Sequence, residues 1–254
     1  MQVVVDSLLT HYVVQGKGKL VVLLHGWGDS SAGLRELAAA LAKNQQVVAL
    51  DLPGFGSTEA PKSAWNLSDY ATFVQHFLQK IDKSDVTVLV GHSNGGAIAI
   101  RGLASGKIKA DKLVLLAAAG IRGEYKGRVK ALRVFTKIGK ALSAPLPKGV
   151  QQKLRKKVYN SVGSDMLVAE HMQATFKKIV SDDVREDVAK LSLPTLLLYG
   201  EADEQAPPWY GEAYHQLIPG SILEILPGVG HFVHLERPAE VTKAVQEFIN
   251  ARPA

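Results

Sequence analysis

The segment VGHSNGG, residues 90–96, follows an apolar run rich in β-branched residues and precedes the helix-like stretch AIAIRGLA. The apolar run at 86–89 is typical of a buried strand. The chain must then reverse within about three residues, and Gly91 and Gly95 lack the Cβ atoms that would clash in such a turn. Ser93 is therefore predicted to lie on a sharp strand-to-helix turn, with its hydroxyl exposed at the positive end of the next helix.

Short apolar runs alternate with longer amphipathic stretches along most of the chain. The runs are too short for stable helices, and most are apolar on successive residues, which is typical of parallel strands covered on both faces. They occupy residues 20–24, 46–50, 86–90, 112–116, 195–199 and 222–226, and the helix-like stretches occupy 31–42, 68–80, 97–105, 209–217 and 238–250. Residues 3–6 and 11–15 suggest an antiparallel hairpin ahead of them. The pattern predicts an α/β fold with a doubly wound, mostly parallel sheet.

Residues 121–190 interrupt this alternation because they contain helix-like segments and no strand-like run. They carry 16 Lys and Arg against 7 Asp and Glu, whereas the rest of the chain carries 14 against 17. Within 128–142, apolar and basic residues recur on different sides of a helix. We therefore expect a basic helical cap at 121–190, inserted between two parts of one core at 1–120 and 191–254.

Length and composition agree with a folded globular protein. A chain of 254 residues is long enough for one full-sized α/β domain. It contains no cysteine, which excludes thiol nucleophiles, disulfides and thiolate metal sites. No apolar run approaches the ~18–20 residues that span a bilayer, and no basic leader opens the sequence. The expected location is the cytoplasm, with no transmembrane segment and no nucleic-acid partner.

Four further motifs follow strand-like runs. HGWG at 25–28 and DLPGFG at 51–56 follow the first two runs, YGEAD at 199–203 ends a late run, and GVGH at 228–231 follows the last. With the G-x-S-x-G turn around Ser93, they make the chain resemble the α/β-hydrolase superfamily over essentially its whole length, as an esterase-like member with a serine nucleophile and a helical cap. The resemblance implies an eight-stranded sheet with helices on both faces.

That resemblance also implies a role for each site residue. Ser93 would be the nucleophile, His231 the base that takes its proton, and Asp203 the acid that orients the imidazole. The backbone N–H groups of Trp27 and Asn94 would bind the developing oxyanion. The predicted pathway is an acyl-enzyme cleaved by water, and it requires no cofactor and no metal.

Several other residues compete for these roles. Glu204, or Glu124 after the run at 112–116, could replace Asp203 as the acid, and His234 could replace His231 as the base. His25 and His92 are expected to hydrogen-bond loop backbone near the site, and Asp51 to lie in a turn. His231 and His234 are too few and too close in one loop to predict a metal site. Aromatic residues are more often part of a core, so Phe55, Trp65 and Trp209 are assigned no role.

The resemblance leaves the substrate open. The main hypothesis is a serine hydrolase of carboxylic esters with small or medium acyl groups. C–C bond hydrolases of ring-cleavage pathways also combine a serine with a helical cap, but many carry tryptophan after the catalytic histidine, where this chain has Phe232. Thioesterases, lactonases and esterases of acyl-carrier-protein esters share the same machinery. A ligand receptor built on a hydrolase scaffold is the alternative outside enzymes.

The basic segment at 121–190 has three possible uses. It could be a solvated helix face, the commonest reading of a charge run. It could instead steer an anionic ester or an acidic carrier protein toward the site, or adsorb to anionic lipid. The sequence gives no oligomeric state.

Overall fold

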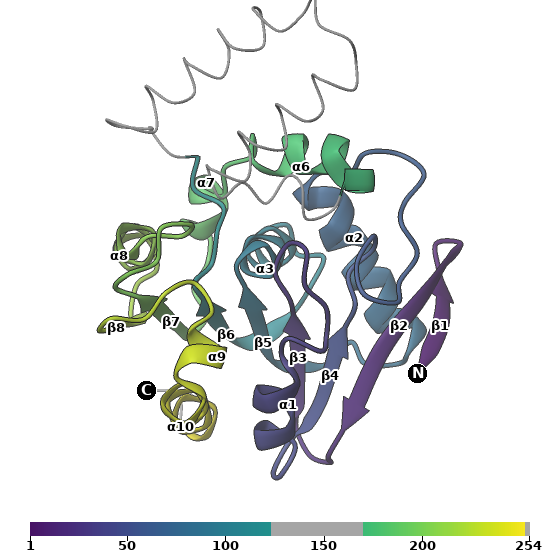
Figure 1. Ribbon diagram of the computed structural model, residues 1–254. Coiled ribbons are helices and arrows are strands. Elements are labelled where there is room, and N and C mark those ends of the chain that lie inside the picture. The colour runs from purple at the N-terminus through teal and green to yellow at the C-terminus, as the bar shows by residue number, and fades with distance from the viewer. Residues whose placement is uncertain (123–169, 252–254) are drawn as a thin grey trace, which may run out of the picture.

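The computed structural model describes residues 1–122 and 170–251, which form an eight-stranded sheet in the order β1-β2-β4-β3-β5-β6-β7-β8 (Figure 1). The strands are β1 Gln2–Val5, β2 Leu8–Gln15, β3 Leu20–Leu24, β4 Gln46–Leu50, β5 Val86–His92, β6 Ala110–Leu116, β7 Thr195–Gly200 and β8 Ile222–Leu226. β3 to β8 pair in parallel, whereas β2 pairs antiparallel with both β1 and β4. The predicted parallel sheet and its N-terminal hairpin are confirmed.

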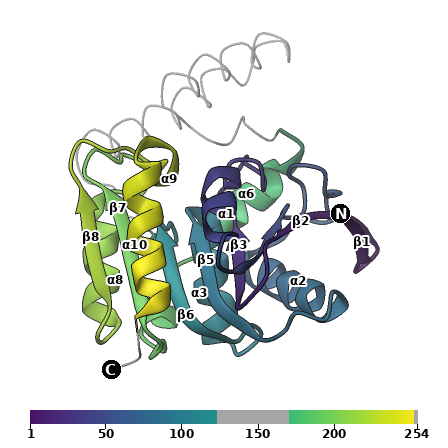
Figure 2. The same ribbon diagram turned by 90° about the horizontal axis from the view of Figure 1, so that it is seen from below.

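Helices cover both faces of the sheet. α1 Arg35–Leu41 and α10 Pro238–Asn250 lie on one face, and α2 Leu67–Lys80, α3 Asn94–Ala104 and α8 Pro208–Leu217 lie on the other (Figure 2). The shorter helices are η2 Glu170–Met172, α6 Gln173–Ile179, α7 Arg185–Val188 and α9 Val233–Glu236. The described part of the chain is therefore a three-layer α/β structure.

The sequence of β3 explains why helices cover both faces of the sheet. All five residues of LVVLL are buried. Leu20, Val22 and Leu24 join the core under α2, α3 and α8, while Val21 and Leu23 join the core under α1 and α10. Since successive side chains of a strand point to opposite faces, a run without polar residues needs apolar cover on both sides. Each fully buried Leu or Val contributes about 1.5–3 kcal/mol.

Two helix starts and one short helix differ from the sequence prediction. α1 begins at Arg35 rather than at residue 31, since Ser31 lies in a turn where its N–H donates to Asp51 Oδ1 at 2.7 Å. α3 begins at Asn94 rather than at residue 97, although two glycines occupy its first turn. α9 was not predicted, because four residues are too few to show a helical period.

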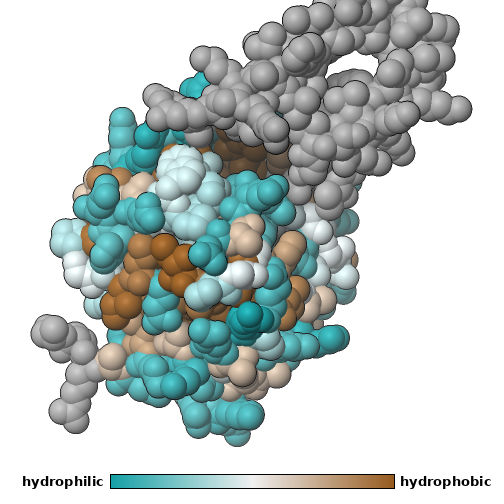
Figure 3. Space-filling model, turned by 60° about the vertical axis from the view of Figure 1, so that its left-hand side comes forward, coloured by the Kyte–Doolittle hydropathy of each residue, from teal (hydrophilic) through white to brown (hydrophobic). Residues whose placement is uncertain are grey.

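The sheet ends at β8, an edge strand with exposed apolar residues. Figure 3 turns this end of the sheet toward the viewer and shows apolar surface gathered among hydrophilic side chains; Ile222 and Ile225 of β8 are 49% and 37% exposed. Exposed Glu224 stands between them, and a charge on an edge strand opposes pairing with another sheet.

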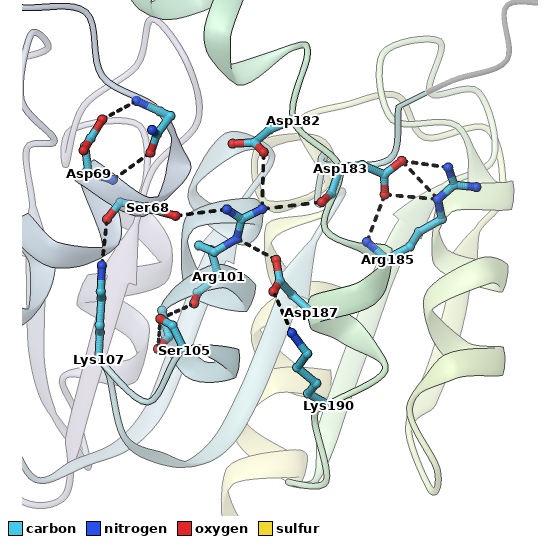
Figure 4. A network of polar contacts seen from close by, with 12 residues as sticks. Ser68, Asp69, Arg101, Ser105, Lys107, Asp182, Asp183, Arg185, Asp187 and Lys190 are labelled. Carbon is cyan, nitrogen blue, oxygen red and sulfur yellow. Dashed lines mark hydrogen bonds and ion pairs between the residues drawn. The ribbon is translucent and has the colours of Figure 1, made fainter.

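Residues 170–190 are the last part of the segment predicted as a cap, and they lead the chain into β7. Arg101 of α3 holds this segment through ion pairs with Asp182 and Asp187 and also donates to Ser68 Oγ of α2 at 3.0 Å (Figure 4). The remaining residues assigned to the cap, 123–169, include the basic stretch at 128–142 and lie outside the described residues. Across the described ranges, no helix is long and apolar enough to cross a membrane.

Candidate active site

Ser93 sits on a strained turn between β5 and α3. Its backbone adopts φ 50° and ψ −117°, a conformation that non-glycine residues rarely take. The Ser93 N–H donates to the carbonyl of Leu116 in β6 at 3.0 Å, and the Ser93 carbonyl accepts from Ala119 N–H at 3.0 Å. The neighbouring strand thus holds the turn from both sides, which lets the strained conformation persist.

Glycines flank Ser93 because its turn is packed tightly against the core. A Cβ added to Gly95 would lie 2.3 Å from the carbonyl oxygen of Leu24, and one added to Gly91 would lie 2.5 Å from Cα of Gly96. Both clashes involve backbone atoms, which cannot move aside as a side chain can. The glycines thus allow α3 to start directly beside the end of β3.

The structure brings Ser93, His231 and Asp203 together from three separate loops. His231 Nε2 lies 2.9 Å from Ser93 Oγ, and His231 Nδ1 lies 2.7 Å from Asp203 Oδ2. Asp203 Oδ1 accepts from the N–H groups of Gln205 and Ala206 at 2.7 and 2.9 Å. Asp203 and His231 are buried.

These contacts determine where the imidazole proton lies. The Asp203 carboxylate can only accept, so the proton of neutral His231 is on Nδ1 and the lone pair of Nε2 faces the Ser93 hydroxyl. In this arrangement Nε2 can accept the hydroxyl proton while Asp203 stabilises the resulting cation. The geometry therefore provides an activated serine.

Trp27 and Asn94 both lie at the cavity that Ser93 faces. Trp27 follows the end of β3, and Asn94 is the first residue of α3, where backbone N–H groups have no partner within the helix. Both residues line a cavity of about 170 Å³ that Ser93 and His231 also line. The other described lining residues are Leu67, Ala97, Ala119, Gly120, Ile121, Phe176, Ile179, Val180, Asp182, Gln205 and Tyr210. The cavity is thus mostly apolar around the serine, with polar groups on part of its wall.

The Asn94 side chain is a feature that the sequence did not reveal. The residue is only 4% exposed, and neither Oδ1 nor Nδ2 has a hydrogen-bond partner among the described residues. A buried amide without partners is unfavourable, so this side chain is a site of unsatisfied polarity next to Ser93.

His25 and His92 hydrogen-bond loop backbone, as expected. His25 Nδ1 donates to the Gly26 carbonyl at 2.7 Å, and His25 Nε2 accepts from Leu52 N–H at 2.9 Å. His92 Nε2 donates to the carbonyl of His231 at 3.1 Å. Burial lowers the pKa of both histidines, that of His92 to well below its ordinary value. Neutral His25 thus fixes the loop after β3, and neutral His92 positions the loop that carries His231.

The competing residues take other positions. Glu204 is exposed, whereas its neighbour Asp203 points inward to His231. Glu124 lies outside the described residues. His234 is buried and its ring faces the backbone of Gly33, whereas the Ser93 hydroxyl faces His231. The expected turn residue Asp51 accepts from the N–H groups of Ser31 and Ser57 at 2.7 and 2.9 Å.

The three aromatic residues without an assigned role stand apart from the described cavity wall. Phe55 is buried and packs edge-on against Trp27 with ring centroids 4.8 Å apart. Trp65 packs against Tyr70 at 5.2 Å, and Trp209 is 44% exposed. None of the three is among the described lining residues.

Curated relatives are distant but cover the chain. An uncharacterized hydrolase of Bacillus subtilis is 27% identical over 264 residues, which cover 96% of this chain and 94% of the relative. A 2-hydroxy-6-oxo-6-(2'-aminophenyl)hexa-2,4-dienoic acid hydrolase of Metapseudomonas resinovorans is 26% identical, covering 96% and 88%. A pimeloyl-[acyl-carrier protein] methyl ester esterase of Aliivibrio fischeri is 24% identical, covering 94% and 97%.

Solved structures share the fold at low identity. An esterase from Exiguobacterium antarcticum superposes with a TM-score of 0.76 at 24% identity, covering 98% of this chain and 99% of that one. A meta-cleavage product hydrolase from Pseudomonas fluorescens gives a TM-score of 0.75 at 22% identity, covering 98% and 97%. The sequence model of the alpha/beta hydrolase family matches residues 21–244, and with the sheet order and the strand-end motifs it identifies this chain as a member of that family.

Proposed function

We propose that this protein is a serine hydrolase that cleaves carboxylic esters of small or medium acyl groups through an acyl-enzyme. The observation that carries the proposal is the continuous contact from Asp203 through His231 to Ser93, at 2.7 and 2.9 Å beside the cavity. Ser93 Oγ attacks the ester carbonyl while His231 Nε2 takes its proton, and His231 then returns the proton to the leaving alcohol. Water releases the acid by the same route.

The N–H groups of Trp27 and Asn94 are the proposed oxyanion donors. They come from the ends of β3 and β5, and so they flank Ser93 at the cavity. Such donors act on charge that develops in the transition state, and losing one typically costs about 3 kcal/mol of barrier.

The decisive experiment is hydrolysis of p-nitrophenyl esters of graded acyl length, combined with labelling by a fluorophosphonate. We expect a burst of p-nitrophenol and stoichiometric labelling, with Ser93→Ala abolishing both. Ser93→Ala removes only one oxygen atom, so far-ultraviolet circular dichroism should match the wild type. A folded wild-type protein that binds the esters tightly without turnover would instead support a ligand receptor.

A C–C bond hydrolase is the second candidate, favoured by the 26% identity to the dienoic acid hydrolase over 96% of this chain. Incubation with a 2-hydroxy-6-oxo-dienoate separates the two proposals, since its cleavage removes a conjugated chromophore. Faster turnover of the dienoate than of any p-nitrophenyl ester would replace the esterase proposal. Thioesters, lactones and acyl-carrier-protein esters belong in the same substrate panel.

The proposed partners of the basic segment 121–190 can be tested with the same assay. If its charge steers anionic esters or an acidic carrier protein, kcat/KM for an anionic ester falls with added salt while that for a neutral ester does not. If kcat/KM depends on salt to the same extent for both esters, the basic residues form a solvated helix face and do not steer the substrate.

A further inference from the structure

Three side chains that the proposed chemistry does not use meet behind Ser93 and His231. They are Asp29, His92 and His234, called here the Asp29–His92–His234 cluster. One ligand atom from each residue lies within 4.8 Å of the others. The rings of His92 and His234 are 4.6 Å apart between centroids and nearly perpendicular, with an interplanar angle of 69°.

Each member of the cluster lies close in sequence to a proposed catalytic group. Asp29 lies two residues after Trp27, His92 directly precedes Ser93, and His234 lies three residues after His231. The cluster therefore joins the loop after β3, the last residue of β5 and helix α9 at one point.

Buried atoms without partners gather at this point. Among the described residues, Asp29 Oδ2, His92 Nδ1 and the ring nitrogens of His234 are buried, and apart from a backbone hydrogen bond between Gly33 and His234 they have no hydrogen-bond partner. His92 and His234 are 1% and 2% exposed. Because buried polar atoms are nearly always satisfied, several together indicate a missing occupant that binds lone pairs.

The hydrogen bond of His92 favours a cation as that occupant. His92 Nε2 donates to the His231 carbonyl, so the lone pair of its ring lies on Nδ1, which is buried and has no hydrogen-bond partner among the described residues. His234 adds a second imidazole and Asp29 a carboxylate oxygen, and groups of both kinds bind cations.

We propose that the Asp29–His92–His234 cluster binds one divalent transition-metal ion, for which zinc is the probe. Two imidazoles and a carboxylate suit zinc, cobalt or nickel better than calcium or magnesium, which prefer oxygen ligands. The bond from His92 Nε2 to a carbonyl is the usual outer contact of a metal-binding histidine. Tetrahedral zinc with bonds of about 2.0–2.2 Å places its ligand atoms about 3.3–3.6 Å apart, so side chains whose ligand atoms lie within 4.8 Å of one another move inward by up to about 1 Å when the ion binds.

The ion would fasten these three parts of the chain rather than take part in the reaction. Its expected effect is on stability, since an ion that binds only the folded chain stabilises it by an amount that grows with the logarithm of the ion concentration divided by Kd, and so raises Tm. The proposal can therefore be tested independently of ester hydrolysis.

The test uses the full chain, stripped with EDTA and titrated with zinc sulfate by calorimetry, and with cobalt chloride by visible absorption. We expect one ion per chain, a Tm that rises with zinc, and cobalt d–d bands typical of nitrogen and oxygen ligands. Asp29→Asn and His234→Gln should each raise the zinc Kd at least tenfold. His76→Gln is the matched control. His76 lies on α2, away from the cluster, and its Nδ1 forms an exposed pair with Asp6 Oδ2 at 2.8 Å.

The controls leave each outcome interpretable. Asp29→Asn conserves shape at a partly exposed position, so it decides the question even if His234→Gln fails to fold. If the Tm of the wild-type chain does not change when zinc is added, the cluster holds a water molecule or nothing, and the proposal is wrong. It is also wrong if Asp203→Asn weakens zinc binding as much as Asp29→Asn does, since the ion then sits on His231.

Discussion

The imidazole of His231 contacts a different residue through each ring nitrogen, and the proposed chemistry depends on both contacts. Nδ1 faces a carboxylate that is fixed by two backbone N–H groups, and Nε2 faces the Ser93 hydroxyl. Two hydrogen bonds to Oδ1 leave Oδ2 of Asp203 aimed at the ring. The tautomer is thus set by the loop at 203–206 and not by His231 alone.

Asp203→Asn tests this assignment and separates Asp203 from its neighbour. An amide can turn its NH₂ toward Nδ1 and favour the wrong tautomer, so kcat should fall about ten-thousandfold with little change in Tm. The matched control is Glu204→Gln, at an exposed position one residue on, which should leave kcat within about twofold of the wild type. Steady-state hydrolysis of a p-nitrophenyl ester measures both. A larger loss for Glu204→Gln would make Glu204 the acid.

At the scale of elements, the junction between β5 and α3 depends on close backbone packing. Gly95 lies against the carbonyl at the end of β3, and Gly91 lies against the start of α3. Helix propensity alone disfavours glycine in this first turn. The packing explains why glycine is needed there.

Gly95→Ala should destabilise the fold by about 3 kcal/mol or more, because the new Cβ would lie 2.3 Å from a backbone oxygen. Gly106→Ala is the control that separates the effect of a steric clash from the effect of a positive backbone φ. It introduces the same methyl at φ +70° with nothing within 4 Å, and should cost only about 1 kcal/mol. Urea unfolding measures both values, and equal penalties would show that packing at Gly95 is not the constraint.

Asp51 joins the loops after β3 and β4, and its charge matters for that link. Burial raises the pKa of its carboxyl, but hydrogen bonds from Ser31 and Ser57 outweigh this and hold the pKa below its ordinary value. The Asp51 carboxylate also faces His11 Nδ1 at 3.0 Å. The stabilisation is thus present above the unfolded-state pKa of about 3.9 and is lost as pH falls through the lower folded-state value.

Asp51→Asn should therefore destabilise the protein by about 2 kcal/mol at pH 7, because a buried charged acceptor is lost. The difference from the wild type should shrink as the pH approaches 3, where the wild-type carboxyl begins to protonate. Urea unfolding at both pH values measures the two differences. A penalty of the same size at both would contradict a role for the ionised carboxylate.

For the molecule as a whole, Arg101 connects the core to the segment that lines one side of the cavity. It reaches from α3 to Asp182 and Asp187 (Figure 4). From this segment Phe176, Ile179, Val180 and Asp182 line the cavity. The side chains of Arg101 and Asp187 are 19% and 14% exposed, so removing one leaves the other poorly solvated.

Arg101→Met, which keeps the aliphatic stem, should cost about 3 kcal/mol because Asp187 keeps its charge without its partner. KM for the proposed ester should also rise, since the cavity wall is held less firmly. Arg185→Met is the control: its side chain is 53% exposed beside Asp183, and exposed pairs contribute about 0–1 kcal/mol. Urea unfolding and steady-state kinetics provide the two measurements. If both variants lose the same free energy of unfolding, the ion pairs of Arg101 do not stabilise the fold more than an exposed pair does.

The fold could be predicted because each of its parts leaves a local pattern. Runs such as LVVLL at 20–24 can be satisfied only by apolar cover on both faces, and the five strand-end motifs mark where loops gather. These motifs gave the resemblance to the α/β-hydrolase superfamily, and that resemblance grouped Ser93, Asp203 and His231 as one site. Helix starts were predicted less well, since the start of α1 depends on a hydrogen bond from Ser31 to distant Asp51.

By itself, the sequence determined the order of the elements and the residue types at each strand end, since these depend on hydrophobic period and backbone sterics over a few residues. Only the tertiary structure decided which side chains meet: Arg101 with Asp187, Asn94 with the cavity, and Asp29 with His92 and His234. Such contacts join residues far apart in the chain. Their geometry depends on the summed packing of the elements between them, which no local pattern encodes.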